Sequence, residues 1–161
     1  MKTLIRPFAL AAALLSGAGA ASAGPATVTF DHPENFADMP RDTSSREQVL
    51  ADLSDHFGAL ASKLPAGQEM KVEVLDLDLA GRNWPGMWGT RELRVVEGGA
   101  DWPHIKFRYT INQDGKVIKS GEETVQNMDY LWRLNRYSSG DSLRYEKQML
   151  DSWFKTLTAA R

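Results

Sequence analysis

The stretch HIKFRYTINQDGKVIKSGEETV, residues 104–125, carries the strongest structural signal in this chain. Its first half alternates apolar and polar side chains, the pattern of a strand with one buried face. Asp114-Gly115 then supplies a pair of residues that tolerates the positive backbone angles of a tight turn. We therefore predict an antiparallel hairpin, with a basic outer face on its first strand and a second strand over 116–125.

A helix is predicted upstream of this hairpin, at residues 45–64. Ser44 stands three residues before Glu47, a spacing that satisfies the free amides at the start of a helix. Pro65 ends the pattern. Apolar residues recur in between at steps of three and four, which predicts one buried stripe: Val49, Leu50, Leu53, Phe57, Leu60, Ala61 and Leu64.

Shorter apolar segments predict the remaining elements, and the Gly- and Trp-rich stretch 80–89 is predicted to be loop. The predicted strands are 26–30, 70–79 and 92–96, and the predicted C-terminal helices are 127–134 and 142–157, the second capped by Asp141. This order predicts an α+β fold in a single domain over residues 24–161. We expect an antiparallel or mixed sheet of about five strands, with two main helices packed on one face.

The strand 70–79 has one face that begins apolar and ends acidic. Strict alternation places Leu75, Leu77 and Leu79 together, and it places Asp76 and Asp78 on the other face. Two neighbouring carboxylates repel each other, so we expect a positive partner beside them. A divalent cation is one interpretation, and an ion pair with Arg82 or Arg108 is the other.

The N-terminus has the order of a secretory signal peptide. Lys2 and Arg6 precede an apolar run over 8–15, and small residues follow up to Ala23. The apolar run is far shorter than the roughly 20 residues that span a bilayer. We predict a signal peptide over 1–23 cleaved after Ala23, with Ala20 as the nearest alternative site, and a periplasmic protein without a transmembrane anchor.

Composition excludes several classes of function. The predicted mature chain keeps seventeen Lys and Arg against twenty-one Asp and Glu, a formal charge of −4, and it has no basic run. Nucleic acid is therefore not an expected partner. The chain contains no cysteine, which excludes thiol nucleophiles, disulfides and thiolate metal sites.

Three stretches together resemble a known family. They are VEVLDLDLAG at 72–81, WPHIKFRY at 102–109, and a C-terminal region that runs from RYSS at 136–139 through LRYEK at 143–147 to LDSWF at 150–154. Along nearly all of its mature length the chain is similar to exported bacterial proteins known as the domain of unknown function numbered three thousand and sixteen. The resemblance implies a Gram-negative envelope protein and carries no activity, ligand or catalytic residue.

Arginine and tyrosine residues gather at the junction of the two predicted C-terminal helices. Guanidinium groups beside aromatic rings suit recognition of an anionic glycan, a lipid headgroup or a partner carboxylate. The other interpretation is that these side chains tie a loop to the body of the fold. The candidates are Arg133, Arg136, Tyr137, Arg144 and Tyr145, and Tyr130, Trp132 and Lys147 are interleaved with them.

The stretch 83–89 is a second candidate surface. Trp84 and Trp88 stand there among glycines, which suits stacking on a sugar or contact with a protein. The alternative is that this loop folds back to complete the core.

Catalytic and cofactor signatures are not recognised in the sequence. His32, His56 and His104 show no metal-ligand spacing, and they are expected in a loop, on the polar side of a helix and on the outer face of a strand. No Gly-x-Ser-x-Gly spacing surrounds Ser138 and Ser139. We therefore expect no metal and no cofactor.

These observations favour a non-catalytic binding or interaction module of the cell envelope, whose partner is an envelope component or protein that the sequence does not identify. The alternative is an envelope hydrolase whose acid and base come from separate elements, Asp76 or Asp78 with Glu122 or His104. A third interpretation, a structural subunit, requires an uncovered apolar patch of several hundred Å².

Overall fold

The computed structural model describes residues 26–84 and 93–159. The predicted signal peptide and its cleavage site lie outside these residues. Within them, neither helix is both long enough and apolar enough to cross a bilayer. The elements in chain order are β1 (Thr27–Phe30), a 3₁₀ turn η1 (Pro33–Asn35), α1 (Thr43–Ala61), β2 (Gln68–Asp78), β3 (Arg82–Trp84), β4 (Leu93–Val95), β5 (His104–Gln113), β6 (Lys116–Gln126) and α2 (Arg144–Ala159).

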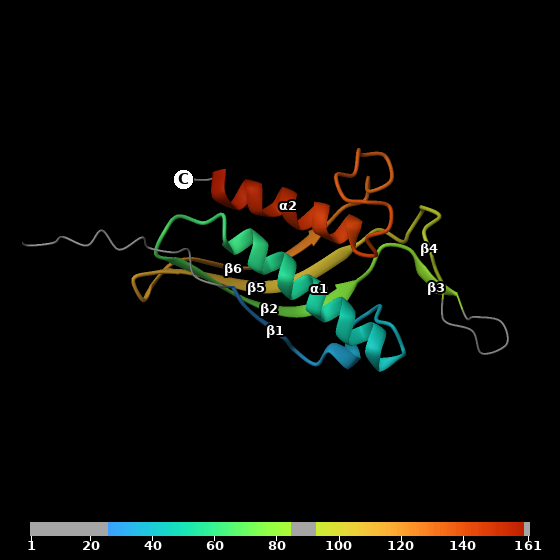
Figure 1. Ribbon diagram of the computed structural model, residues 1–161, viewed down its shortest axis with the longest axis horizontal. Coiled ribbons are helices and arrows are strands. Elements are labelled where there is room, and N and C mark those ends of the chain that lie inside the picture. Colours follow the sequence, from blue (N-terminus) through green and yellow to red (C-terminus); the bar gives the residue numbers. More distant parts are fainter. Residues whose placement is uncertain (1–25, 85–92, 160–161) are drawn as a thin grey trace, which may run out of the picture.

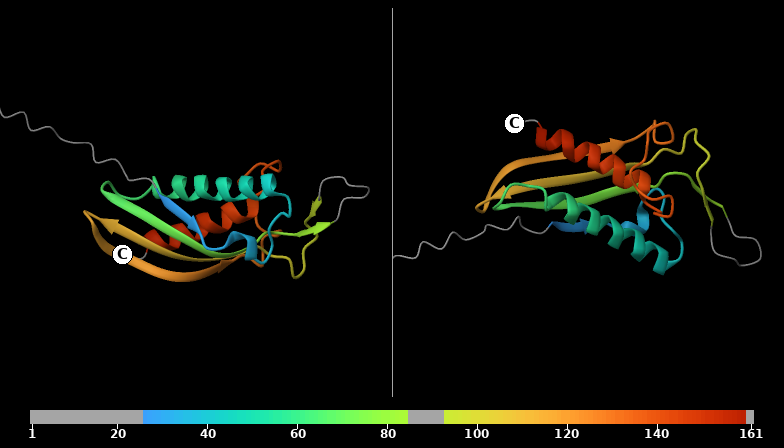
Figure 2. Two further views of the ribbon diagram at one scale, coloured as in Figure 1. Left: turned by 90° about the horizontal axis from the view of Figure 1, so that it is seen from below. Right: turned by 45° about the horizontal axis from the view of Figure 1, so that its top comes forward.

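The main sheet has the strand order β1-β2-β5-β6, and β1 is its one parallel strand (Figure 1). Helices α1 and α2 both lie on the same face of this sheet (Figure 2). The predicted α+β fold with a mixed sheet and two helices on one face is confirmed. The main sheet holds four strands, because β4 pairs with β3 in a separate hairpin, where a loop was predicted.

The β5–β6 hairpin forms where the sequence predicts it. Asp114 and Gly115 have φ angles of 52° and 75°, as a tight turn of this kind requires. The apolar positions of β5 are buried against the helices, while Lys106 and Arg108 are exposed on the outer face. The alternation in the sequence therefore corresponds directly to the two faces of the sheet.

Helix α1 starts two residues earlier than predicted. Asp42 caps it by accepting a hydrogen bond from the Ser45 amide at 3.1 Å, so the predicted capping role of Ser44 is wrong. At the other end, the amide of Leu64 bonds to the carbonyl of Ala61 in a tighter turn just before Pro65. The predicted apolar stripe lies in the core.

The indole of Trp153, on α2, packs against three other aromatic rings of the core. Its ring lies 4.8 Å from Phe107, 5.5 Å from Tyr109 and 6.4 Å from Phe57, measured between ring centroids. The indole N–H donates to the carboxylate of Glu123 on β6 at 2.8 Å. Trp153 thus joins both helices to two strands of the sheet.

The predicted helix over 127–134 is wrong. This stretch consists of turns, in which the amide of Trp132 bonds to the carbonyl of Asp129 at 3.0 Å. The amide of Asn127 bonds to the carbonyl of Pro103 at 3.1 Å. This contact with a distant segment holds the start of the stretch, and the apolar residues after it share no buried face.

Gly81 is required where β2 leads into the β3–β4 hairpin. Its φ is +82°, and a Cβ there would collide with the carbonyl oxygen of Val95. We expect Gly81→Ala to lower the free energy of unfolding by about 3 kcal/mol, because strain and overpacking add. Gly99→Ala is the control, because Gly99 also has a positive φ but has open space around it. We expect this variant to lower the free energy of unfolding by about 1 kcal/mol. Urea unfolding measures both, and equal losses would contradict the role of the close contact.

Candidate functional site

A β-bulge in β2 explains why one predicted face of this strand begins apolar and ends acidic. The register against β5 shifts between Val74 and Asp76. The extra residue reverses the alternation, so Val74 and Leu77 are both buried and Leu75 is partly exposed. The predicted grouping of Leu75 with Leu77 is therefore wrong, whereas Asp76 and Asp78 pair with residues of the outer face of β5.

The two aspartates have separate partners. Asp76 accepts hydrogen bonds from the amides of Ala37 and Leu77, each at 2.9 Å. Asp78 lies 3.6 Å from the imidazole of His104. The two arginines predicted as ion-pair partners of these aspartates bind other acids. Arg82 pairs with Glu97, and Arg108 pairs with Glu73 and Glu122.

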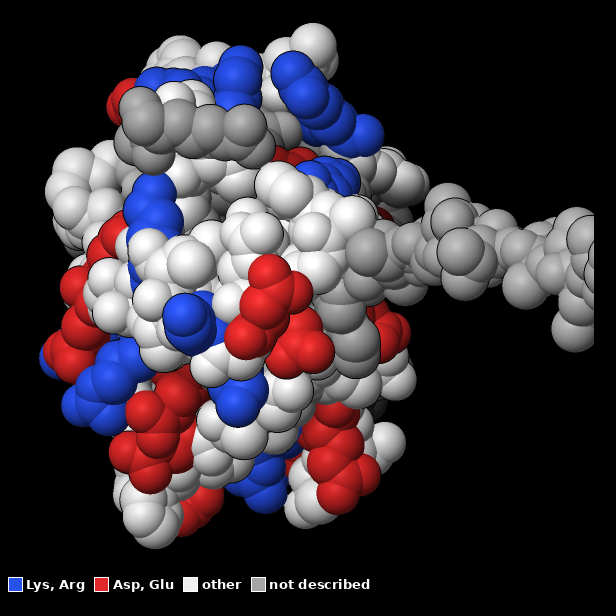
Figure 3. Space-filling model, turned by 90° about the vertical axis from the view of Figure 1, so that its left-hand side faces the viewer, with Lys and Arg blue, Asp and Glu red and all other residues white. Residues whose placement is uncertain are grey.

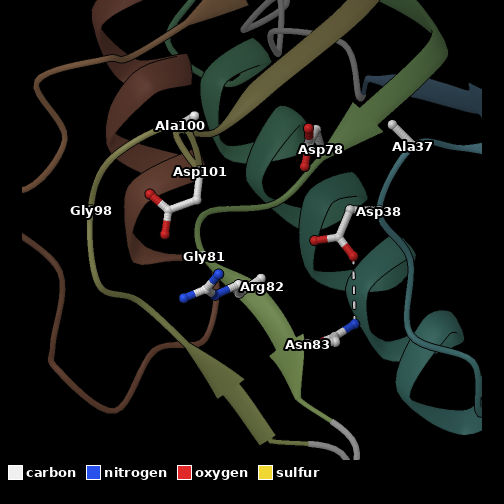
Figure 4. Close-up of a pocket in the computed structure, with 9 residues that line it drawn as sticks. All are labelled: Ala37, Asp38, Asp78, Gly81, Arg82, Asn83, Gly98, Ala100 and Asp101. Atoms are coloured by element: carbon white, nitrogen blue, oxygen red, sulfur yellow. Dashed lines mark hydrogen bonds between the residues drawn. The ribbon is translucent and has the colours of Figure 1, made fainter.

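A cavity of about 380 Å³ opens beside Asp78, between the end of β2 and the β3–β4 hairpin. Figure 4 shows three aspartates around it, from separate segments: Asp38, Asp78 and Asp101. Asp38 accepts from Arg94 at 2.7 Å, and Asp101 accepts from the hydroxyl of Tyr130 at 2.8 Å. Burial raises the pKa of Asp78 above its ordinary value, and the nearby Asp38 carboxylate adds to the shift, while His104 opposes it.

This cavity does not present a metal site. Among the residues of 26–84 and 93–159, no three His, Cys, Asp or Glu side chains are grouped so that they could hold a metal ion. Two of the three aspartates are already bound by protein donors. Glu122, another candidate for acid–base chemistry, is exposed and bridged by Lys106 and Arg108, which hold its pKa below the ordinary range.

A buried acid on α2 and a mostly buried base on β4 both bind the segment that joins β2 to β3. Glu146 is 1% exposed and accepts from the Ala80 amide at 2.7 Å. Arg94 donates to Asp38 and to the Ala80 and Gly81 carbonyls. Among the described residues, Glu146 Oε2 and Arg94 Nη2 are buried without a hydrogen-bond partner. Burial raises the pKa of Glu146, and the charge of Arg94 opposes this.

Glu146 should therefore make stability depend on pH. A raised pKa in the folded state means that its contribution is complete below the ordinary value of 4.5 and is lost as pH rises through the folded pKa. We expect Glu146→Gln to gain stability relative to the wild type as the pH rises above 4.5. Urea unfolding across this range measures the difference.

Glu122→Gln is the matched control for this titration. The pKa of Glu122 is lowered by Lys106 and Arg108, so its contribution is present above the ordinary value and is lost as pH falls. Above the ordinary value of 4.5 the control should therefore run parallel to the wild type, and it should differ in slope only at lower pH. If Glu146→Gln also ran parallel to the wild type above this value, the assigned environment of Glu146 would be wrong.

The predicted Arg and Tyr junction is mostly engaged inside the protein. The hydroxyl of Tyr137 donates to Asp151 at 2.7 Å. The guanidinium of Arg144 lies 4.9 Å over the ring of Tyr145, whose edge packs on Tyr130 at 4.9 Å. Tyr137 and Tyr145 thus hold the 127–143 segment against α2, and Arg144 stacks on Tyr145, whereas Arg133 and Arg136 are exposed.

His56 is buried between the two helices, so its predicted position on the polar side of a helix is wrong. Its Nε2 lies 3.1 Å from the carbonyl of Lys147 and 3.3 Å from Asp151. The edge of its ring faces Tyr137. Burial lowers the pKa of His56, although Asp151 opposes this. Helix α2 therefore covers a face of α1 that the sequence of α1 predicted to be polar.

Between two anchored residues the same segment presents apolar side chains to solvent. Tyr130 is buried and bonded to Asp101, and the side chain of Asn135 donates to the carbonyl of Arg144 at 2.9 Å. Between them, Trp132 is 90% exposed and Leu134 is 91% exposed. We call residues 131–134 the apolar tip.

The apolar tip stands at the same end of the molecule as the β3–β4 hairpin (Figure 1). Leu131 lies against Gly98, just after β4. Trp84 is half exposed, with the guanidinium of Arg82 5.4 Å over its ring, and Trp88 lies outside the described residues. In the described part of the chain, seven of nine exposed large hydrophobic residues belong to the β3–β4 hairpin with the residue after it and to the 127–143 segment: Trp84, Leu93, Val96, Met128, Leu131, Trp132 and Leu134.

Sequence reasoning named Trp84, Arg133 and Arg136 as binding candidates and noted Trp132 among the aromatic residues of the junction, but it missed Leu134 and the exposure of both apolar side chains. The available signal was the run Leu131-Trp132-Arg133-Leu134 between Asp129 and Asn135, polar residues common in turns. Assigning this run to a helix concealed the signal.

Comparison with known proteins gives one finding. The family model for the protein of unknown function DUF3016 matches residues 24–156. No match was found among curated proteins or among solved structures. Because this match spans most of the chain, including all strands and nearly all of α2, the protein belongs to the DUF3016 family.

Proposed function

We propose that this protein is an exported, non-catalytic binding module of the cell envelope that contacts its target through the apolar tip. The observation that carries this proposal is the exposure of Trp132 and Leu134 on a segment fastened at both ends. Burying a large apolar side chain contributes about 1.5–3 kcal/mol. An anchored loop that exposes two such side chains to water gains this free energy when a target buries them.

Export is supported by the order of residues at the N-terminus. Lys2 and Arg6, the apolar run 8–15 and the small residues up to Ala23 follow the arrangement of a cleaved secretory signal. The family match starts at residue 24, so this segment lies outside it. We propose a periplasmic location on this basis.

One observation favours the alternative, an envelope hydrolase. Asp78 lines the cavity beside His104 with a raised pKa, as an acid–base residue would. The other acids considered, Asp76 and Glu122, are occupied by backbone amides and by basic side chains. The binding proposal expects Asp78→Asn to leave target binding unchanged.

Photocrosslinking in the native cells tests the proposal. A photoreactive phenylalanine replaces Trp132 in one variant and Ile118, an exposed apolar residue of the β5–β6 hairpin, in the control. We expect adducts with a specific target from position 132 and none of these from position 118. Absence of adducts at 132, or the same adducts from both positions, would refute the assignment of the binding surface.

A further inference from the structure

We infer that the target of the apolar tip is the surface of a phospholipid membrane, into which Trp132 and Leu134 insert. This inference rests on the proposed function and specifies the class of target. It is argued from the shape of the tip, from its chemistry and from the distribution of charge over the molecule.

The shape of the tip suits a fluid surface. The most exposed apolar side chains belong to four consecutive residues between the anchors Tyr130 and Asn135. A stable protein–protein interface buries about 800 Å² on each partner, and the four residues of the tip by themselves supply less than that. A lipid surface accepts single side chains at different depths and needs no complementary shape.

The residue types at the tip match the layers of a membrane interface. Tryptophan is enriched at the level of the headgroups, and leucine partitions into the hydrocarbon. Arg133 lies between Trp132 and Leu134, and Arg136 follows within two residues. Both arginine side chains are exposed, so their guanidinium groups are placed to bind lipid phosphates as the apolar side chains enter.

Charge is divided between the tip and the rest of the molecule. Residues 127–139 contain two arginines against one aspartate, a charge of +1, whereas the predicted mature chain carries −4. Asp129 is the acid nearest to Arg133, at 3.7 Å, and both side chains are about two-thirds exposed. An ion pair this exposed is weak, so Arg133 can exchange it for a phosphate.

The opposite end of the molecule differs. Figure 3 views that end and shows acidic and basic side chains interspersed over its surface. Val117 and Ile118 on β6 are exposed apolar residues with charged Lys116 and Lys119 on either side. They provide a matched control, because they test whether any exposed apolar pair of this protein adheres to lipid.

Vesicle flotation tests the inference with the full mature chain. The probes are vesicles of phosphatidylethanolamine with phosphatidylglycerol, and vesicles of phosphatidylcholine alone. We expect binding to the anionic vesicles, at least about a tenfold loss of affinity in Trp132→Ser/Leu134→Ser, and a smaller loss in Arg133→Gln/Arg136→Gln. Val117→Ser/Ile118→Ser should bind as the wild type does. Unchanged melting temperatures confirm that the variants fold.

Two results would overturn the inference. One is wild-type protein that floats with neither kind of vesicle. The other is an equal loss of binding in the 117/118 control. If the wild-type protein does not float with vesicles while crosslinking from position 132 captures a protein, the membrane inference is wrong and the proposed function stands. If position 132 gives no adduct of any kind, the proposed function itself fails.

Discussion

Trp153→Ala is expected to lower the free energy of unfolding by about 3–5 kcal/mol, the loss typical of removing a buried aromatic side chain. The indole lies among the rings of Phe57, Phe107 and Tyr109, so its removal opens a cavity where α1, α2 and β5 meet. A large part of the stability of a small domain depends on this one side chain.

Trp153→Phe separates packing from hydrogen bonding. It keeps an aromatic ring but loses the donor to Glu123, and we expect a smaller loss of about 1–2 kcal/mol. The exposed-tryptophan control, Trp132→Ala, should lose less than about 0.5 kcal/mol. Urea unfolding followed by circular dichroism measures all three, and a loss near 1 kcal/mol in Trp153→Ala would mean that the core is centred elsewhere.

Arg94→Met is expected to produce the second large effect, a loss of about 3 kcal/mol, because it leaves the Asp38 carboxylate without its ion-pair partner and removes the positive charge that opposes the raised pKa of Glu146. Glu146 is almost fully buried, and Asp38 is about one-fifth exposed. Water can therefore compensate little of the lost charge. The β3–β4 hairpin should loosen first, which amide hydrogen exchange detects.

The same hairpin contains the control for this prediction. Arg82→Met removes an arginine whose partner Glu97 is half exposed, and we expect a change below about 1 kcal/mol. Combining Arg94→Met with Glu146→Met should recover part of the loss, since the uncompensated buried acid is then gone. No recovery in the double variant would show that Arg94 acts without Glu146.

The elements with local signals were predictable from the sequence. The Asp114-Gly115 turn and the apolar stripe of α1 are formed by residues near one another in the chain, and both lie where predicted. The α2 stripe, with Trp153, also reached the core. Asp141 accepts from the Leu143 amide just before α2, as expected of a cap.

The features that were missed depend on contacts between distant residues. The bulge at Leu75 reverses the faces of β2 only because β5 pairs on both sides of it. Glu146 and Arg94 are charged residues whose partners, Ala80 and Asp38, lie on distant segments of the chain. The exposure of Trp132 and Leu134 was missed for another reason, because hydrophobicity normally predicts burial and here the apolar residues remain outside.

The absence of cysteine from the chain permits the most direct test of the account, because a single introduced thiol carries an environment-sensitive fluorophore to one position. Leu134→Cys reports on the apolar tip, and Val117→Cys reports on the opposite end. With anionic phospholipid vesicles, the account predicts a blue-shifted emission from position 134, quenched by labelled lipid, and no change at position 117. An unchanged spectrum at 134, or the same shift at both positions, would contradict it.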